Sequence, residues 1–144
     1  MIAVGLDANI VVRLIMQDDP AESARAREIF GELTPSRKGH ICQLVQAEIW
    51  WVLRRAYKLT AQQATAALQG LLESDDLELE QPADLAWALE RTASGADLAD
   101  ALIYQASSRR APRVLTFDKK AADRAFGLEY AGPVHLVDPT TRES

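Results

Sequence analysis

The sequence is poor in the residues that build disulfides and zinc sites. It has one cysteine, Cys42, and two histidines, His40 and His135, in 144 residues. A single cysteine cannot form an internal disulfide, and the two histidines lack the spacing of zinc ligands. The composition therefore excludes a disulfide scaffold, argues against a zinc enzyme and suits a reducing, cytoplasmic compartment.

Long apolar runs and a leader segment are also missing. No apolar stretch approaches the roughly 18 residues that a membrane span needs, and the first residues carry no basic segment of the signal-peptide kind. No glycine-rich phosphate loop is present, which argues against ATP chemistry. We therefore expect a cytoplasmic protein without a membrane anchor.

Positive charge is in deficit. The chain has 16 Lys and Arg against 21 Asp and Glu, a net charge of −5. This balance argues against a protein that coats nucleic acid through bulk charge. It leaves open an enzyme that meets nucleic acid through a metal ion and a few local cations.

The chain does contain a regular alternation of short apolar runs with amphipathic segments. Such an alternation predicts a three-layer α/β/α sandwich around a mostly parallel central sheet, formed by residues 1–144 as a single domain. The expected strands are residues 2–6, 40–42, 77–80, 113–117 and 133–137. The expected helices are residues 9–16, 20–30, 44–57, 61–72, 83–92, 97–108 and 119–126.

Four carboxylates stand where a core residue or a helix cap would be usual. Asp7 ends the first apolar run, Asp118 follows the apolar residues 114–117, and Asp100 precedes the apolar residues 101–103. Glu48 interrupts the apolar face of a predicted helix. Sites in parallel sheets form beyond the carboxyl ends of strands, which places Asp7 and Asp118 at one edge.

Each of these acids also has a plain structural interpretation. Asp7 and Asp118 could simply cap the helices that follow them, because Asp is a favoured N-cap residue. Asp97 lies three residues before Asp100, the spacing of a cap and its partner in the first turn. For Asp97 we prefer the capping role, or a secondary role in the site.

Glu48 discriminates most sharply between the two interpretations. Leu44, Val45 and Val52 lie three or four residues away, so they share its helix face and place its carboxylate on or beside the buried stripe. A buried charge needs a nearby cation or a raised pKa. The alternative is an edge residue that reaches solvent or pairs with Arg55.

A converged cluster of carboxylates repels itself unless a cation lies within it. Oxygen ligands suit Mg²⁺ or Mn²⁺ rather than metals that prefer thiolate or imidazole. Such a site can activate water for attack on a phosphodiester and neutralise charge on the leaving oxygen. Neither histidine accompanies a plausible nucleophile, so no Cys–His or Ser–His–Asp arrangement competes.

Four segments carry a resemblance to a known family. Residues 6–13, 46–48, 97–103 and 115–118 resemble, in this order, the four acidic motifs of PIN domains, and in particular those of VapC-type toxins. The resemblance covers nearly the whole chain. It implies a Mg²⁺- or Mn²⁺-dependent endoribonuclease, the toxin of a toxin–antitoxin pair, which a small cognate antitoxin inhibits.

The resemblance also assigns roles to single residues. The acids that match the metal site are Asp7, Glu48, Asp100 and Asp118. Asn9 matches a small polar position after the first acid, and Thr116 matches a hydroxyl before the fourth. Both would orient ligands or water as part of the catalytic site. Arg13 resembles a frequent basic position that faces phosphate or a partner.

Several cations and aromatic residues are candidates for contacts with the RNA substrate or with a partner. Trp50, Trp51 and Trp87 could stack on bases, although tryptophans are more often core or interface anchors. The apolar segment 49–53 is interpreted as a surface for the antitoxin or for a homodimer. The candidate cations are Arg54, Arg55, Lys58, Arg109, Arg110, Lys119 and Lys120.

Two other classes of function remain open. A metal-dependent phosphatase or a phospho-acceptor domain also places an Asp after the first strand, but the phosphatase needs a second Asp where Asn9 stands. A non-catalytic PIN-like module would bind only RNA or a partner, and the intact acids argue against it. DNA cleavage stays possible, because a metal site does not read the 2′-hydroxyl group.

Overall fold

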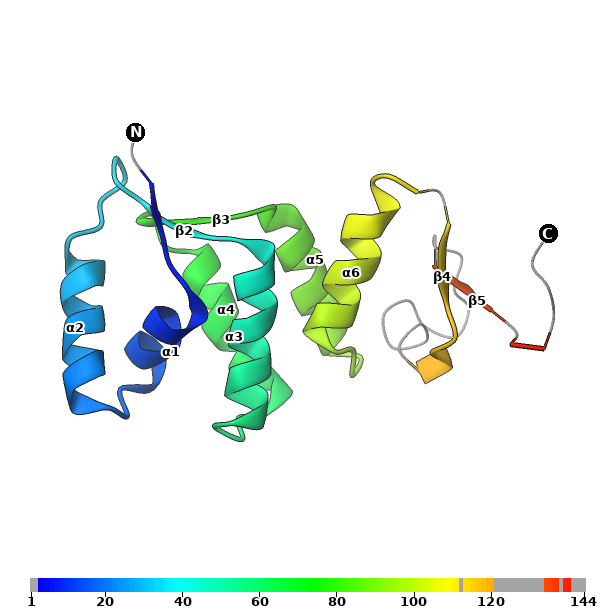
Figure 1. The fold of residues 1–144 in the computed structure, drawn as a ribbon, viewed down its shortest axis with the longest axis horizontal. Coiled ribbons are helices and arrows are strands. Elements are labelled where there is room, and N and C mark those ends of the chain that lie inside the picture. Colours follow the sequence, from blue (N-terminus) through cyan, green and yellow to red (C-terminus); the bar gives the residue numbers. More distant parts are fainter. Residues whose placement is uncertain (1–2, 112, 121–133, 138, 141–144) are drawn as a thin grey trace. The chain divides into compact units, whose positions relative to one another are not determined.

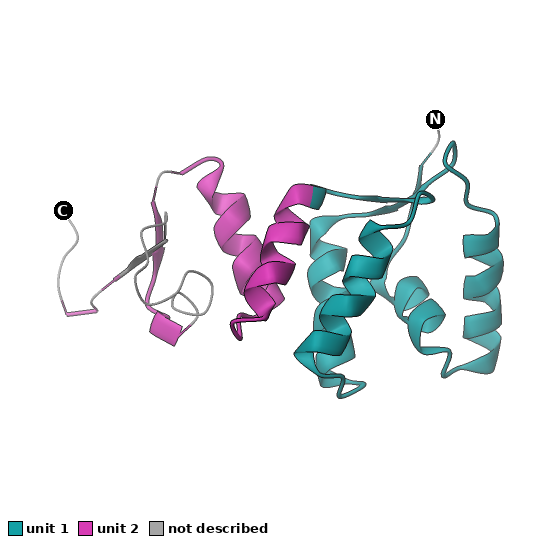
Figure 2. Ribbon diagram, turned by 180° about the vertical axis from the view of Figure 1, so that it is seen from behind, with its two compact units in different colours: residues 1–82 teal, residues 83–144 magenta. Residues whose placement is uncertain are grey.

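The computed structural model describes residues 3–111, 113–120, 134–137 and 139–140 (Figure 1). The chain divides into two compact units, residues 1–82 and residues 83–144 (Figure 2). Each unit has helices and a parallel sheet of its own. Among the described residues, no helix is both long and apolar enough to cross a bilayer.

The first unit contains a three-stranded parallel sheet in the order β1-β2-β3. The strands are β1 (Val4–Gly5), β2 (Gly39–Ile41) and β3 (Leu77–Leu79). Val4 lies opposite Gly39, which in turn lies opposite Leu77. Leu77 and Leu79 are buried, while Glu78 between them is exposed, as the alternating sequence predicts.

Gly39 occupies a position on the central strand where a larger residue has no room. A Cβ atom there would lie 2.6 Å from Leu6 Cδ1 and 3.0 Å from both Leu33 Cδ1 and Leu77 Cδ2. These leucines are buried and come from three separate segments of the unit. The absence of a side chain at residue 39 therefore allows the core to close over β2.

Four helices complete the first unit: α1 (Ala8–Met16), α2 (Pro20–Gly31), α3 (Gln43–Arg55) and α4 (Ala61–Leu72). Their starts follow ordinary capping chemistry. Asp19 caps α2 ahead of Pro20, and Thr60 forms a capping box with Gln63 at α4. Helix α1 packs against α2 and α3, and α3 packs against α4. The largest fully buried side chains of this core are Ile41, Ile49, Leu53 and Leu68.

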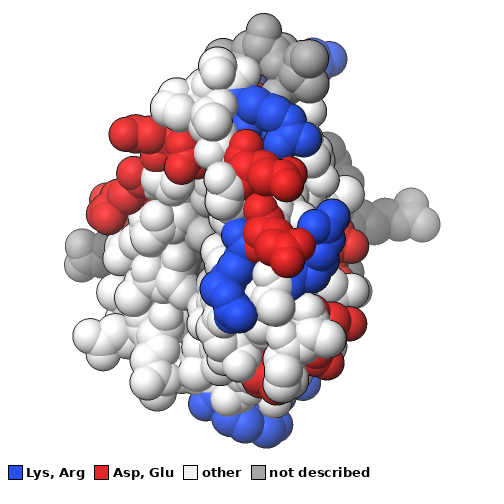
Figure 3. All heavy atoms as spheres, turned by 90° about the vertical axis from the view of Figure 1, so that its left-hand side faces the viewer, with Lys and Arg blue, Asp and Glu red and all other residues white. Residues whose placement is uncertain are grey.

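The outer face of the first unit at α2 carries charges of both signs. Acidic and basic side chains lie next to one another there (Figure 3), and Arg25 Nη1 lies 2.7 Å from Glu28 Oε2 within the helix. Interleaved charges of this kind keep a face soluble without producing a strong local potential. This face is therefore a poor candidate for binding RNA through charge alone.

The second unit contains α5 (Pro82–Thr92), α6 (Leu98–Ser108) and a two-stranded parallel sheet of β4 (Val114–Thr116) and β5 (Val134–Leu136). Helix α6 packs against β4. The core side chains of this unit include Leu85, Leu89, Leu98 and Leu102. Asp84, buried on α5, forms an ion pair with Arg109 at the end of α6.

The predicted fold class is confirmed. The strands of both described sheets pair in parallel and alternate with helices, as in a PIN-like α/β/α fold. The strands are shorter than predicted: the first comprises residues 4–5 rather than 2–6. Of the helix predicted at residues 119–126, Lys119 and Lys120 are helical and the remainder lies outside the described residues. That residues 1–144 form one domain stays a prediction.

Candidate metal centre

Asp7 follows β1 and caps α1. Its Oδ1 atom accepts a hydrogen bond from the Ile10 backbone N–H at 3.2 Å, and its side chain is exposed. The capping role that the sequence allowed is therefore real. It occupies one carboxylate oxygen, and the described residues provide no hydrogen-bond donor to the other. Capping and metal binding are compatible at this residue.

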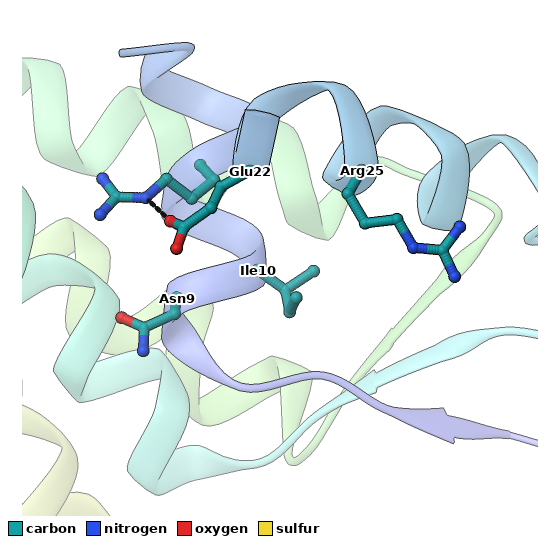
Figure 4. A pocket seen from close by; sticks show the side chains of 5 residues that line it. Asn9, Ile10, Glu22 and Arg25 are labelled. Atoms are coloured by element: carbon teal, nitrogen blue, oxygen red, sulfur yellow. Dashed lines mark hydrogen bonds and ion pairs between the residues drawn. The ribbon is translucent and has the colours of Figure 1, made fainter. Parts of the chain in front are cut away.

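Asn9 lies on the first turn of α1, at the edge of a pocket of about 230 Å³ between α1 and α2. Its side chain is exposed. Figure 4 shows Asn9 and Ile10 on α1 with Glu22 and Arg25 on α2 around the pocket. Arg13 completes the lining.

Arg13 is engaged in a network of contacts inside the first unit. It donates to Glu22 at 2.5 Å, to both carboxylate oxygens of Asp18 at 3.1 and 3.2 Å, and to Tyr57 Oη at 2.6 Å. Tyr57 Oη in turn donates to Asp18 at 2.7 Å. The hydrogen bond with Glu22 is the main cause that raises the pKa of Arg13. The network ties α1 to α2 and to the end of α3, so this guanidinium serves the fold.

The predicted burial of Glu48 is wrong, because its side chain is exposed on α3. The spacing predicts a buried stripe of Leu44, Val45 and Val52, but Leu44 is 84% exposed and the two valines are half-buried. Apolar residues occur all around this helix, so their spacing did not identify the inner face. Among the described residues no ion pair joins Glu48 to Arg55 either. Its role as a metal ligand stays a prediction.

Gln46 is a buried residue of the same motif to which the sequence assigned no role. Its Nε2 atom donates to the Ile41 carbonyl oxygen at 3.1 Å and to the Glu80 carbonyl oxygen at 2.9 Å. The Glu80 carboxylate accepts from the Gln43 backbone N–H at 2.9 Å. These bonds fasten the start of α3 to the ends of β2 and β3, and so they position the helix that carries Glu48. No sequence signal marks them, because the amide acts through backbone oxygens.

Three acids lie near one another in the second unit. Asp97 caps α6 by accepting from the Asp100 backbone N–H at 3.2 Å, which confirms its predicted capping role. Asp100 is half-buried, and its pKa is raised, first by burial and then by the negative charges of Asp97 and Asp118. The electrostatic environment of Asp100 is therefore one that a bound cation would relieve.

Tyr104 is a further residue of this cluster that the sequence analysis missed. It is only 6% exposed, lies one helical turn after Asp100, and forms a side-chain hydrogen bond with Thr116. The Thr116 hydroxyl oxygen also accepts from the Asp118 backbone N–H at 3.0 Å. Burial is the largest cause that raises the pKa of Tyr104, and Asp100 and Asp118 add to it. The spacing of four residues from Asp100 is the signal that could have indicated it.

These acids suit a hard divalent cation by their chemistry. Their donor atoms are carboxylate oxygens, which Mg²⁺ and Mn²⁺ prefer. Burial first, and then its acidic neighbours, disfavour the anionic form of Asp100 and raise its pKa. In the part of the chain that the structure describes, no three Asp, Glu, His or Cys side chains are grouped closely enough to hold a metal ion. That Asp7, Glu48, Asp100 and Asp118 together form the metal site therefore stays a prediction.

The three tryptophans have different environments. Trp50 is 5% exposed and belongs to the core, whereas its neighbour Trp51 is 53% exposed. Trp87 is half-buried, with the guanidinium of Arg91 at 4.9 Å from its ring centre. Ile49 and Leu53 are also buried, so most of the segment predicted as a partner surface is core.

The candidate cations also separate into two groups. Arg109 forms an ion pair with buried Asp84, and Arg54 donates to the Leu59 carbonyl oxygen at 2.9 Å while it lies over Trp50. These two residues hold the fold together. The remaining candidates are exposed: Arg55, Lys58, Arg110, Lys119 and Lys120.

A comparison with protein families gives one match. The model of the PIN domain family matches residues 4–127, a range that includes all four candidate acids and extends through both units. No curated protein matches the chain at a significant level.

Proposed function

This chain belongs to the PIN domain family, whose members are generally nucleases that use divalent metals, and we propose that it is a Mg²⁺- or Mn²⁺-dependent endoribonuclease. The observation that carries the proposal is the half-buried Asp100 beside two further acids, within a chain that matches the family over residues 4–127. A site that repels its own charges is suited to a cation and not to a neutral ligand.

The proposed roles of the acids follow from the resemblance of their motifs to those of PIN domains. Asp7, Glu48, Asp100 and Asp118 would hold the metal through carboxylate oxygens. Bound there, the ion supplies an activated water and neutralises the charge that develops on the leaving oxygen. Partial burial of Asp100 strengthens its attraction for a cation, because the local dielectric is lower than in water.

Two polar residues would position the reacting groups. Thr116 holds the backbone of Asp118 through its hydroxyl oxygen, and so it restricts the direction of that carboxylate. Asn9 presents an exposed amide two residues after Asp7 and can orient a water molecule. Both residues act on ligand geometry and not on charge.

The proposed biological role is the toxin of a toxin–antitoxin pair, inhibited by a small antitoxin and active as a homodimer. Its support is the resemblance of the four acidic motifs to those of VapC-type toxins. Exposed apolar residues of the second unit, Ile103, Leu115 and Phe117, are of the kind that marks protein interfaces. A short reading frame beside the gene, whose product co-purifies with this chain and stops its activity, is the expected finding.

Cleavage of a defined panel of single-stranded RNAs tests the enzymatic proposal. We expect cleavage with Mg²⁺ or Mn²⁺, none with EDTA, and none for Asp7→Asn or Asp100→Asn. Asp19→Asn is the matched control, because Asp19 caps α2 as Asp7 caps α1 but has no proposed metal role. Cleavage that survives EDTA would exclude the metal mechanism.

The same panel distinguishes the alternatives. Tight RNA binding with no cleavage at saturating Mg²⁺ would indicate a non-catalytic binding module. Hydrolysis of a phosphate monoester in place of RNA would indicate a phosphatase. Cleavage of the matching single-stranded DNA would widen the substrate class to nucleic acid in general.

A further inference from the structure

One face of α3 is exposed along its length and carries residues of different chemistry. Leu44, Glu48, Trp51 and Arg55 are all exposed, and they follow one another at intervals of four, three and four residues. Residues at these intervals lie along one side of a helix. The inner side is taken by Ile49, Trp50 and Leu53, which are buried. This row from Leu44 to Arg55 is called the outer stripe of α3.

We propose that Trp51, together with Arg55, is a stacking site for a base of single-stranded RNA beside the proposed metal ligand Glu48. The inference rests on the proposed ribonuclease function and specifies where the substrate binds. The Arg55 guanidinium carbon lies 5.9 Å from the centre of the Trp51 ring. A tryptophan that is 53% exposed while its neighbour Trp50 is buried has a ring surface accessible to a ligand.

The order Glu48, Trp51, Arg55 along the stripe matches the order of phosphate, base and next phosphate along a single strand. With a rise of about 1.5 Å per residue, Trp51 lies about 4.5 Å beyond Glu48 along the helix axis, and Arg55 about 10.5 Å beyond it. A phosphate held by the metal at Glu48 would thus have its neighbouring base within reach of Trp51. The next phosphate would approach Arg55, whose charge attracts it.

The charges at this end of the stripe favour nucleic acid over an apolar protein partner. Arg55 and Lys58 are exposed, and within the ranges that the structure describes neither forms an ion pair. Cations beside an exposed aromatic ring are the combination that single-strand binding sites use. An apolar partner would need an apolar surface around Trp51, whereas its neighbours along the stripe are Glu48 and Arg55. The apolar residue Leu44 lies at the other end.

The experiment measures equilibrium binding of a fluorescein-labelled single-stranded RNA by anisotropy. All variants carry Asp100→Asn so that the RNA stays intact, and circular dichroism verifies their fold. Trp51→Ala should weaken binding by roughly 5- to 150-fold, the range that loss of one stacked base produces. Trp51→Phe, which keeps an aromatic ring, should retain most of the affinity. Arg55→Ala should reduce the slope of log K against log salt by about 0.7, the value for one phosphate contact on a single strand.

Leu44→Ala is the matched control, because Leu44 shares the stripe but lies away from its cations; RNA affinity should not change. A second arm introduces an abasic nucleotide at each position of the RNA in turn. At one position, the losses of binding free energy caused by the abasic nucleotide and by Trp51→Ala should not add up, because both changes remove the same contact.

Each outcome decides the proposal. If the Trp51→Ala variant binds RNA as tightly as its parent, the stacking site is overturned, whether or not the unsubstituted chain cleaves RNA. Changes in self-association for both Trp51→Ala and Leu44→Ala, with RNA affinity intact, would overturn it in favour of a protein interface. Absence of RNA binding by the parent would overturn the site, whereas the cleavage assay of the unsubstituted chain decides the ribonuclease separately. Binding that depends on Trp51 without cleavage by the unsubstituted chain would support the site and contradict only the enzyme.

Discussion

A buried tyrosine links the helix and the turn that carry two acids of the second unit. Tyr104 is hydrogen-bonded to Thr116, and Thr116 accepts from the backbone of Asp118. Asp100 lies one turn before Tyr104 on α6. The hydroxyl therefore couples the position of the helix that carries one acid to the turn that carries another, and we expect it to influence the reaction without touching the substrate.

Tyr104→Phe keeps the ring and removes this link. Loss of one hydrogen bond of ordinary strength should lower the free energy of unfolding by about 0.5–1.5 kcal/mol and the cleavage rate by roughly 2- to 10-fold. Steady-state kinetics at saturating Mg²⁺ measure the rate. Tyr57→Phe is the matched control, because the Tyr57 hydroxyl belongs to the Arg13 network. This variant should have a lower free energy of unfolding and an unchanged cleavage rate. Equal cleavage rates for both variants and the unsubstituted chain would show that the Tyr104 hydroxyl has no influence on the reaction and that Tyr104 serves only the packing of the core.

Asp18 provides a pH dependence that is separate from the metal centre. The hydrogen bond from Tyr57 is the main cause that lowers its pKa below the ordinary value of 3.8, and Arg13 adds to the effect. A carboxylate with a lowered pKa in the folded state stabilises the fold above its unfolded-state pKa. This contribution is lost as the pH falls through the folded-state pKa.

Asp18→Asn should therefore be less stable than the unsubstituted chain at neutral pH. The difference in free energy of unfolding should stay constant down to about pH 5 and shrink as the pH falls below about 4. Urea unfolding of the metal-free protein at a series of pH values from about 7 to about 3 measures it. A difference that grows as the pH falls would contradict the assignment.

At the scale of the elements, the central strand β2 depends on close packing at a glycine. Gly39 faces the ends of Leu6, Leu33 and Leu77, and a Cβ atom added to it would come as close as 2.6 Å to the first of them. Gly70, within α4, has no atom within 4 Å of the same position. The two glycines are therefore a matched pair, one in a crowded strand and one on an open helix face.

Gly39→Ala should lower the free energy of unfolding by about 1–3 kcal/mol, because the methyl group overpacks the core. Gly70→Ala should raise it by about 0.5–1 kcal/mol, because alanine loses less backbone entropy in a helix. Urea or thermal unfolding of both variants gives the values. A stabilising Gly39→Ala would mean that the three leucines repack without cost.

At the scale of the whole molecule, the proposal gives Asp7, Glu48, Asp100 and Asp118 a common metal site. The family match spans all four residues. A single shared ion should make the stability of the chain depend on Mg²⁺ as one cooperative effect.

Mg²⁺ at about 100 times its dissociation constant should therefore stabilise the chain by about 2.7 kcal/mol. Asp7→Asn and Asp100→Asn should each abolish this gain, and the double variant should lose no more than either single one. Thermal unfolding across a Mg²⁺ titration measures the effect. Partial losses that add in the double variant would indicate two independent metal sites.

Much of the local structure was determined by the sequence alone. The predicted helix starts at residues 20 and 61 agree with the structure, in which Asp19 and Thr60 cap these helices. The spacing of Asp97 and Asp100 predicted a cap that the structure shows. The alternation of short apolar runs with amphipathic segments predicted parallel strands joined by helices. These features follow from bonds and periodicities within a few residues, which is why a sequence can reveal them.

The tertiary structure decided which side chains face inward. Adjacent Trp50 and Trp51 have opposite environments, and Glu48 is exposed although its apolar neighbours predicted burial. Gln46 and Tyr104 act through partners that are distant in the sequence, the Glu80 carbonyl oxygen and the Thr116 hydroxyl. A helix with apolar residues on several sides has no intrinsic inner face. Its burial is set by the segments that pack against it, and those contacts exist only once the chain has folded.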